Sequence, residues 1–153
     1  GARIVLNLAP VYPISAETLA AADVLVVNES ECGLILGAPA PQTAEEALTA
    51  AAALRERGTA CVLVTLGADG AVRSSDEGAA HVPALELGRV VDTTGAGDAT
   101  VGVLAAALAM GRGFPEAVDG GMRAGSTAVL AAGAASSYAG ITPVAPRTPR
   151  DRS

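Results

Sequence analysis

The run Ala60–Leu66, which reads Ala-Cys-Val-Leu-Val-Thr-Leu, is almost continuously apolar. Such a run is typical of a parallel β-strand that is buried on both faces, whereas a strand with one solvated face alternates apolar and polar residues. Further strand-like runs occur at Arg3–Ala9 and Asp23–Val27, and helical segments lie between the three. Strands that alternate with helices predict an α/β fold with a mostly parallel sheet.

The predicted helices carry end signals. Thr43 is a typical N-cap for Ala44–Arg57, which has acidic residues in its first turn and arginines in its last, as the helix dipole favours. The turn Gly67–Gly70 predicts a hairpin between Ala60–Leu66 and Ala71–Ser74. The other predicted helices are Ala16–Ala22, Ser30–Leu36, Asp98–Met110 and Pro115–Ala132, and the other short strands are Ala80–Leu85 and Arg89–Val91.

Composition removes several classes of function. The 153 residues suit one domain, and a charged fraction of 17% is too low for disorder. All ten basic residues are arginine, which excludes the Walker-A phosphate loop and Schiff-base chemistry because both need lysine. The single histidine, His81, excludes a His-rich metal site, and we expect it at a strand surface without a role. A net charge of −6, with two Tyr and one Phe, argues against nucleic-acid binding.

The cysteines and the apolar runs bear on location. Cys32 and Cys61 lie in apolar surroundings, which favours buried thiols in a reducing cytosol over a disulfide or a metal pair. Gly1–Pro10 lacks a secretory cleavage pattern, and the longest apolar run, Val103–Met110, is too short to cross a bilayer. We therefore expect a soluble cytoplasmic protein with no membrane partner.

The stretch Val91–Asp98 reads as a strand, a glycine-rich turn and the start of a helix. This arrangement directs several backbone N–H groups and the positive end of the helix dipole at one spot, which suits a phosphate or developing negative charge. Asp98 lies in the first helical turn and faces the same spot. A carboxylate beside an anion hole suits a general base that accepts a proton from an attacking hydroxyl.

Two other interpretations of this stretch are a dinucleotide-binding loop and a structural turn with a capping aspartate. The dinucleotide pattern G-x-G-x-x-G/A fails at its third position, because Gly95 and Gly97 are followed by Thr100. A dehydrogenase-type domain is therefore disfavoured, whereas the structural turn stays open.

Asp92–Asp98, Asp-Thr-Thr-Gly-Ala-Gly-Asp, resembles the second signature of the ribokinase, or phosphofructokinase-B, family of sugar kinases. Three further segments agree in order and spacing: Leu6–Pro10 with the family's N-x-A-P strand end, Asn28–Glu31 with N-x-x-E, and Val64–Gly70 with the T-x-G-x-x-G nucleotide turn. The resemblance extends over about Arg3–Pro143. It implies a three-layer, ribokinase-like α/β fold in which helices flank the sheet.

The resemblance implies roles for individual residues. Asp98 would be the general base and contact the sugar hydroxyl, while Gly95, Ala96 and Gly97 would form the anion hole around the γ-phosphoryl group of ATP. Asn28 would contact the nucleotide phosphates. Glu31 would hold Mg²⁺ through water, as suits a lone carboxylate; a solvated acid at a helix start is the alternative. The other implied nucleotide-binding residues are Thr65, Leu66, Gly67, Ala68, Asp69, Gly70 and Met122.

The family also uses a monovalent cation, K⁺, beside the anion hole. Asp92 and Thr94 fall on its ligand positions, and Ala128, Ala131, Gly133 and Ser137 match the remaining oxygen ligands by spacing. Two positions depart from the family. Met122 stands where an adenine-facing polar residue is frequent. Thr100 replaces a Phe, which predicts weaker packing behind the helix that carries Asp98.

Members of the family are about twice as long as this chain, and their first half carries the sugar-recognition motif and a lid. The resemblance therefore implies a C-terminal nucleotide-binding half over residues 1–142, with a frayed tail over 143–153. We expect a missing N-terminal half or a homo-oligomer to cover the exposed edge, and little kinase activity from the chain alone.

The predicted function is ATP-dependent phosphoryl transfer to a sugar hydroxyl. Ribose, giving ribose 5-phosphate, is the first choice because Asn7–Pro10 is ribokinase-like; other pentoses, fructose-type sugars and nucleosides stay open. The alternative is a nucleotide-binding or regulatory remnant that no longer catalyses. Asp98 favours the enzyme, because binding alone does not need a base.

Overall fold

The computed structural model describes residues 2–133, 138 and 141. The chain forms two compact units, unit 1 over Gly1–Pro83 and unit 2 over Ala84–Ser153. Each unit has its own set of elements, with the sheet in unit 1 and a pair of long helices in unit 2.

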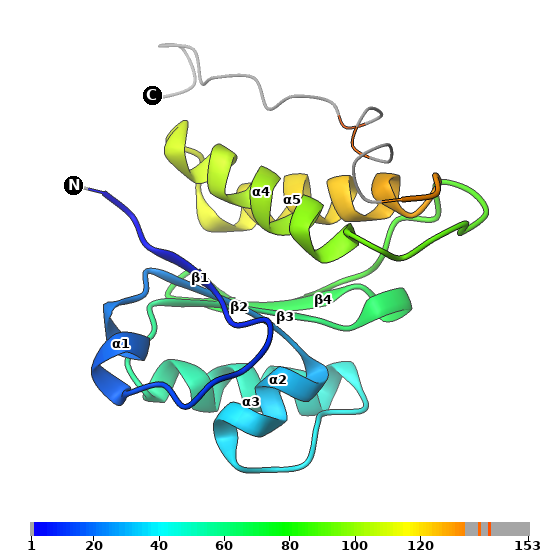
Figure 1. Cartoon of the computed structure of the whole chain (residues 1–153). Coiled ribbons are helices and arrows are strands. Elements are labelled where there is room, and N and C mark those ends of the chain that lie inside the picture. Colours follow the sequence, from blue (N-terminus) through cyan, green and yellow to red (C-terminus); the bar gives the residue numbers. More distant parts are fainter. Residues whose placement is uncertain (1, 134–137, 139–140, 142–153) are drawn as a thin grey trace. The chain divides into compact units, whose positions relative to one another are not determined.

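Unit 1 contains a five-stranded sheet with the strands in chain order (Figure 1). The first three strands are parallel, and two antiparallel hairpin pairings add the last two. Four of the five strands therefore run in the same direction, as predicted, and β4 alone among them runs the other way. The strands are β1 (Val5–Asn7), β2 (Val24–Asn28), β3 (Cys61–Thr65), β4 (Ala71–Ser75) and β5 (Gly78–Val82).

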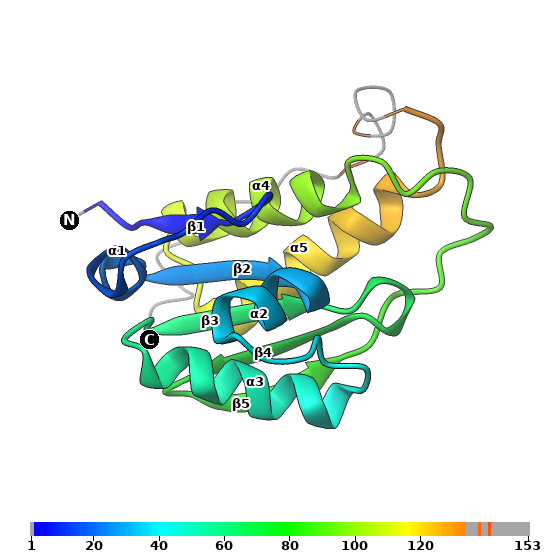
Figure 2. The same ribbon diagram turned by 60° about the horizontal axis from the view of Figure 1, so that its bottom comes forward.

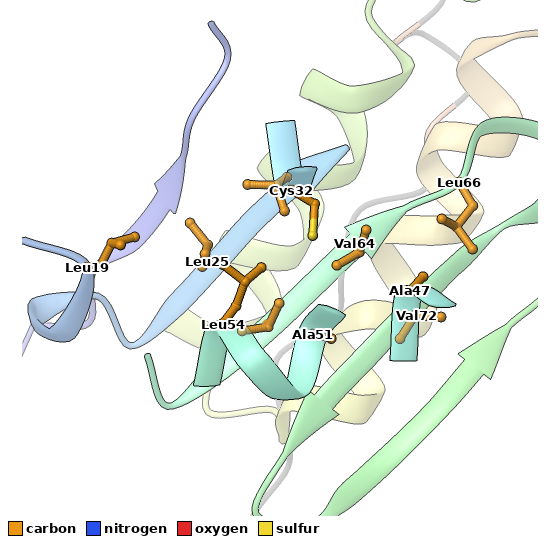
Figure 3. Close-up of a cluster of buried hydrophobic side chains, with 11 residues drawn as sticks. Leu19, Leu25, Cys32, Ala47, Ala51, Leu54, Val64, Leu66 and Val72 are labelled. Atoms are coloured by element: carbon orange, nitrogen blue, oxygen red, sulfur yellow. The ribbon is translucent and has the colours of Figure 1, made fainter. Parts of the chain in front are cut away.

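Three helices cover one face of this sheet (Figures 1 and 2). They are α1 (Ala16–Ala21), α2 (Glu29–Leu36) and α3 (Ala44–Glu56). Ser15 caps the first of them, and the predicted cap Thr43 begins the last. Figure 3 shows the core between helices and sheet, where Ala47 and Ala51 of α3 face Val64 and Val72. These small alanine side chains allow the helix backbone to lie close to the strands.

Unit 2 contains a pair of antiparallel helices, α4 (Ala96–Ala109) and α5 (Phe114–Ala128). Gly121 and Gly125 of α5 lie close against Thr100 of α4. A Cβ atom on Gly121 would lie 2.8 Å from the Thr100 carbonyl oxygen, and one on Gly125 would collide with the Thr100 hydroxyl. Thr100 is buried, so the prediction of weak packing here was wrong: the smaller side chain fits a close helix crossing.

Several predicted boundaries differ. Arg89–Val91 forms no strand; instead the N–H groups of Val91 and Asp92 both donate to the carbonyl of Val129, at 2.8 and 3.3 Å. The Gly67–Gly70 turn contains a 3₁₀ helix over Gly67–Asp69, and the last long helix ends at Ala128 rather than Ala132. Among the described residues, no helix has the length and apolar character needed to cross a bilayer.

Candidate functional site

The N-terminus of α4 is built by glycine. Gly95 is the N-cap residue and has φ = 83°, a left-handed conformation that glycine adopts without strain. No side chain caps this helix. The N–H of Ala96 donates to the Thr93 carbonyl at 3.3 Å, whereas the N–H groups of Gly97 and Asp98 have no acceptor among the described residues. Unpaired amides at the positive end of a helix form a site suited to an anion.

Asp98 lies in the first turn of α4, two residues after the helix begins, and is exposed. Its carboxylate forms no hydrogen bond or ion pair with any of the described residues. Since it does not cap the helix, the interpretation as a structural capping aspartate is wrong. The side chain is therefore free to accept a proton beside the unpaired amides.

Asp92 brings together the segments before α4 and after α5. Its Oδ1 accepts the N–H of Thr94 at 2.9 Å, and its Oδ2 accepts the N–H of Gly133 at 2.9 Å. These hydrogen bonds lower the pKa of Asp92 from 3.8 to about 2, because they stabilise the ionised form. The bond from Gly133 has the largest effect. Three predicted cation-site residues, Asp92, Thr94 and Gly133, thus lie next to one another.

The remaining predicted cation-site residues are less informative. Ala128 is the last residue of α5 and is buried, and Ala131 lies three residues beyond it, half-buried. Ser137 lies outside the described residues.

Unit 1 brings its two nucleotide motifs together. Asn28 ends β2, Thr65 ends β3, and these two residues are register partners in the parallel ladder. Both motifs therefore start at the carboxyl edge of the sheet, where ligands of α/β proteins bind. The 3₁₀ turn that follows Thr65 has positive φ at Gly67 and Gly70, which a side chain would strain. Leu66 is 7% exposed and belongs to the core, so only its backbone can face a nucleotide (Figure 3).

Asn28 and Glu31 form a capping box at the start of α2. The Asn28 side chain accepts the Glu31 N–H, and the Glu31 carboxylate accepts the Asn28 N–H, both at 2.8 Å. This arrangement satisfies two backbone donors that the helix itself leaves unpaired. The N-x-x-E motif therefore has a structural role in this chain that the sequence analysis did not assign to it.

A model of the pfkB family carbohydrate kinases matches residues 5–139. The chain belongs to this family. It is 34% identical over 137 residues to a ribokinase of Haemophilus influenzae, a match that covers 90% of this chain and 44% of that protein. The chain thus spans less than half the length of this relative.

The solved structures that resemble this chain are consistent with its assignment to this family. A structure described as Arabidopsis thaliana ribokinase complexed with ribose and ATP is 31% identical, with a TM-score of 0.80 over 88% of this chain and 44% of that one. A ribokinase from Thermotoga maritima is 30% identical, with a TM-score of 0.77 over 88% of this chain and 45% of that one. The fold is therefore the predicted ribokinase-like α/β fold.

Two residues outside the pfkB motifs contact backbone carbonyls of the predicted site segments, one in the Gly67–Gly70 turn and one at the start of α4. The sequence analysis did not predict either contact. The Nε2 atom of His81, on β5, lies 2.6 Å from the carbonyl oxygen of Asp69. The hydroxyl of Tyr138 donates to the carbonyl of Gly95 at 3.3 Å, across 43 positions of the chain. No local pattern reveals such pairs, because they depend on how distant segments meet.

Two further features bear on the predicted nucleotide residues. Met122 on α5 is 7% exposed, so its side chain is largely committed to packing. In unit 1 a hollow of about 390 Å³ is bordered by Leu66 and Asp69, and by Glu29 and Ser30 at the start of α2. The hollow therefore lies beside part of the predicted nucleotide turn and the start of α2.

Proposed function

We propose that this chain provides the nucleotide side of an ATP-dependent carbohydrate kinase, which transfers the γ-phosphoryl group to a sugar hydroxyl. One observation carries the proposal: within a single turn of α4, the amides of Gly97 and Asp98 and the exposed carboxylate of Asp98 all lack partners among the residues that the structure describes. A capping aspartate would occupy these amides itself. Free amides with a free carboxylate suit an anion together with a group that must lose a proton.

The proposed chemistry is a single displacement at phosphorus. The Asp98 carboxylate accepts the proton of the sugar hydroxyl while the hydroxyl oxygen bonds to the γ-phosphorus. The bond from that phosphorus to the bridging oxygen breaks, and ADP leaves with the electron pair. The amides of Gly95 and Gly97, joined by that of Asp98, would donate to the oxygens of the transferring group, where negative charge is stabilised without reorganisation. The N–H of Ala96, predicted to belong to this anion hole, instead donates to the Thr93 carbonyl.

The nucleotide itself would bind at the carboxyl edge of the unit 1 sheet, on Asn28 and the turn from Thr65 to Gly70. This assignment is supported by the register pairing of Asn28 with Thr65 and by the two positive-φ glycines of the turn. The backbone of this turn can approach a phosphate closely, because Gly67 and Gly70 carry no Cβ.

Two cations fit the residues present. One oxygen of Glu31 accepts a backbone N–H, which leaves the other for a hydrated Mg²⁺; the described residues hold no cluster of three metal-ligating side chains that would bind it directly. A monovalent cation such as K⁺ would be held by backbone carbonyls near Asp92, Thr94 and Gly133, which the Asp92 carboxylate joins. Both ions would offset phosphate charge.

Ribose is the proposed acceptor. Support comes from the similarity to ribokinases and from the N-x-A-P strand end at Asn7–Pro10. The chain matches less than half of these relatives, so the sugar-binding side would come from a further N-terminal half. Transfer to ribose therefore needs a completed protein, and the chain alone is expected to turn over slowly because the acceptor is not positioned.

The test is a chimera in which this chain replaces the matching 44% of the Haemophilus influenzae ribokinase. With labelled ATP and ribose, Asp98→Asn is expected to lower kcat by about 100- to 10,000-fold and to leave the affinity for ADP unchanged. Asp119→Asn, which removes one exposed charge from α5, is the matched control and should leave both values unchanged. Full activity of Asp98→Asn would overturn the assignment, and ADP binding without transfer by the unsubstituted chimera would favour a non-catalytic nucleotide binder.

A further inference from the structure

His81 of β5 donates a hydrogen bond to the turn that joins β3 to β4, and both belong to unit 1. Its Nε2 atom lies 2.6 Å from the carbonyl oxygen of Asp69, the last residue of the 3₁₀ helix in this turn. A carbonyl oxygen only accepts hydrogen bonds, so Nε2 carries a proton in this contact. The neutral Nε2–H tautomer and the doubly protonated ring both meet this requirement, so the contact needs no positive charge.

The backbone hydrogen bonds of the turn join its own residues. The N–H of Leu66 donates to the Gly70 carbonyl at 2.8 Å, and the N–H of Asp69 donates to the Leu66 carbonyl at 3.0 Å. The N–H of Gly70 donates to the Gly67 carbonyl at 3.3 Å. These bonds preserve the internal shape of the turn. The bond from His81 is different, because it comes from a strand residue 12 positions beyond Asp69 and ties the turn to the sheet.

The register of the hairpin places His81 beside the turn. Ala71, the first residue of β4, pairs with Val82, and Val72 pairs with His81. The imidazole ring therefore starts from the second ladder pair after the turn and reaches back to it. The His81 side chain is exposed, so it is not needed to fill the core.

We propose that His81 is a positioning residue for nucleotide binding: its Nε2–H holds the Asp69 carbonyl and so keeps the Gly67–Gly70 turn in its binding conformation. This inference rests on the proposed assignment of the turn to the nucleotide. It gives a role to a residue of β5 that lies outside the pfkB motifs and for which the sequence analysis expected none.

The physical basis is the conformational freedom of the turn. Gly67 and Gly70 have φ of 54° and 91°, and glycine has more backbone freedom to lose than any other residue. A turn that His81 already holds loses less freedom when a ligand orders it, so the ligand binds more tightly. Asp69 also borders the hollow beside the start of α2, so fixing its backbone limits where its side chain can stand next to that hollow.

The first test isolates the contact, using the full chain without nucleotide. His81→Phe removes the donor but keeps a flat ring, and the matched variant His81→Gln keeps an N–H donor at about the place of Nε2. The ¹³C resonance of the Asp69 carbonyl should move upfield in His81→Phe, because the oxygen loses a polarising hydrogen bond, and should stay near its original position in His81→Gln. An Asp69 carbonyl resonance that stays in place in His81→Phe would overturn the inference.

The second test measures affinity by titrating the full chain with ADP and Mg²⁺ while following the amide resonances of Thr65–Gly70. His81→Phe should weaken binding by about 2- to 10-fold, the effect of one lost hydrogen bond, whereas His81→Gln should bind as the unsubstituted chain does. Phenylalanine is favoured in strands, so a merely structural role of this position would leave His81→Phe binding at least as well as His81→Gln. Thermal unfolding shows whether both variants fold like the unsubstituted chain.

The outcomes separate this inference from the proposed function. If ADP moves the Thr65–Gly70 resonances and His81→Phe binds it with unchanged affinity, the role of His81 is overturned and the nucleotide assignment stands. Equal losses of affinity in the two variants would also overturn that role, because His81→Gln retains the donor. If ADP leaves these resonances of the unsubstituted chain in place, the nucleotide assignment of the turn fails, and with it any role of His81 in binding.

Discussion

The Oδ2 atom of Asp92 accepts the backbone N–H of Gly133 at 2.9 Å, although the two residues are 41 positions apart. The same carboxylate accepts the Thr94 N–H, and the Val91 and Asp92 amides donate to Val129. One side chain thus ties the segment after α5 to the glycine turn before α4. The conformation of the predicted phosphoryl-binding turn therefore depends on a segment far away in the sequence.

This relationship predicts how the turn responds to acid. The folded pKa of Asp92, about 2, lies below its ordinary value of 3.8, so the stabilising contribution is complete above pH 3.8 and is lost as the pH falls through 2. The amide resonances of Thr94 and Gly133 should titrate with a midpoint near 2, and those signals should not titrate in Asp92→Asn. A midpoint near 3.8 would show that the two hydrogen bonds do not form.

The close crossing of α4 and α5 predicts opposite effects for two glycines of one helix. In Gly125→Ala the new methyl group would lie 3.2 Å from the Ala96 carbonyl oxygen and collide with the Thr100 hydroxyl, so the free energy of unfolding should fall by about 1–3 kcal/mol. In Gly120→Ala the methyl meets only Val103, at 3.6 Å, and helix propensity should raise stability by up to about 1 kcal/mol. Urea denaturation measures both. Equal changes in the free energy of unfolding for the two substitutions would contradict the close contact between Gly125 and Thr100.

The capping box predicts that Asn28 affects stability separately from nucleotide binding. Asn28→Ala removes the side chain that accepts the Glu31 N–H, and should lower the free energy of unfolding by about 0.5–2 kcal/mol. Asn28→Ser retains a capping oxygen and should cost much less. If Asn28 also contacts phosphates, both variants should bind ADP more weakly. Equal losses of stability in the two variants would contradict the cap.

The burial of Cys32 predicts an inert thiol. The side chain is 0% exposed, and burial raises its pKa to about 11, so almost no thiolate exists at neutral pH. In a Cys61→Ser variant, iodoacetamide should leave the folded chain unmodified and alkylate it in urea, as intact mass shows. Equal rates in the folded and unfolded states would show that Cys32 is accessible.

Local patterns predicted much of the fold. The apolar run of β3 and the capped helix α3 formed nearly as expected, because both depend on neighbours in the sequence. The glycine turn before α4 was also predictable, since a positive φ at Gly95 requires glycine there. The family motifs named Asn28 and Thr65 separately, and the parallel pairing of β2 with β3 places these two residues side by side at the carboxyl edge of the sheet.

Contacts between distant segments were not predictable. Arg89–Val91 has strand-like residues but bonds to Val129 instead of a strand. The family's Phe is replaced by Thr100, and only the glycines of α5 show why the smaller residue fits. The hydrogen bond from Tyr138 to Gly95 depends on where the chain returns after α5, a property of the whole of unit 2.

The most direct test of the account follows the amides of Gly97 and Asp98 in ¹H–¹⁵N spectra of the full chain. With Mg²⁺ present, β,γ-methylene-ATP should move both resonances, whereas ADP should move those of Thr65–Gly70 and leave Gly97 and Asp98 nearly in place. This result is expected if the start of α4 receives the γ-phosphoryl group. Gly97 and Asp98 signals that stay in place while the triphosphate analogue moves the Thr65–Gly70 signals would contradict the account.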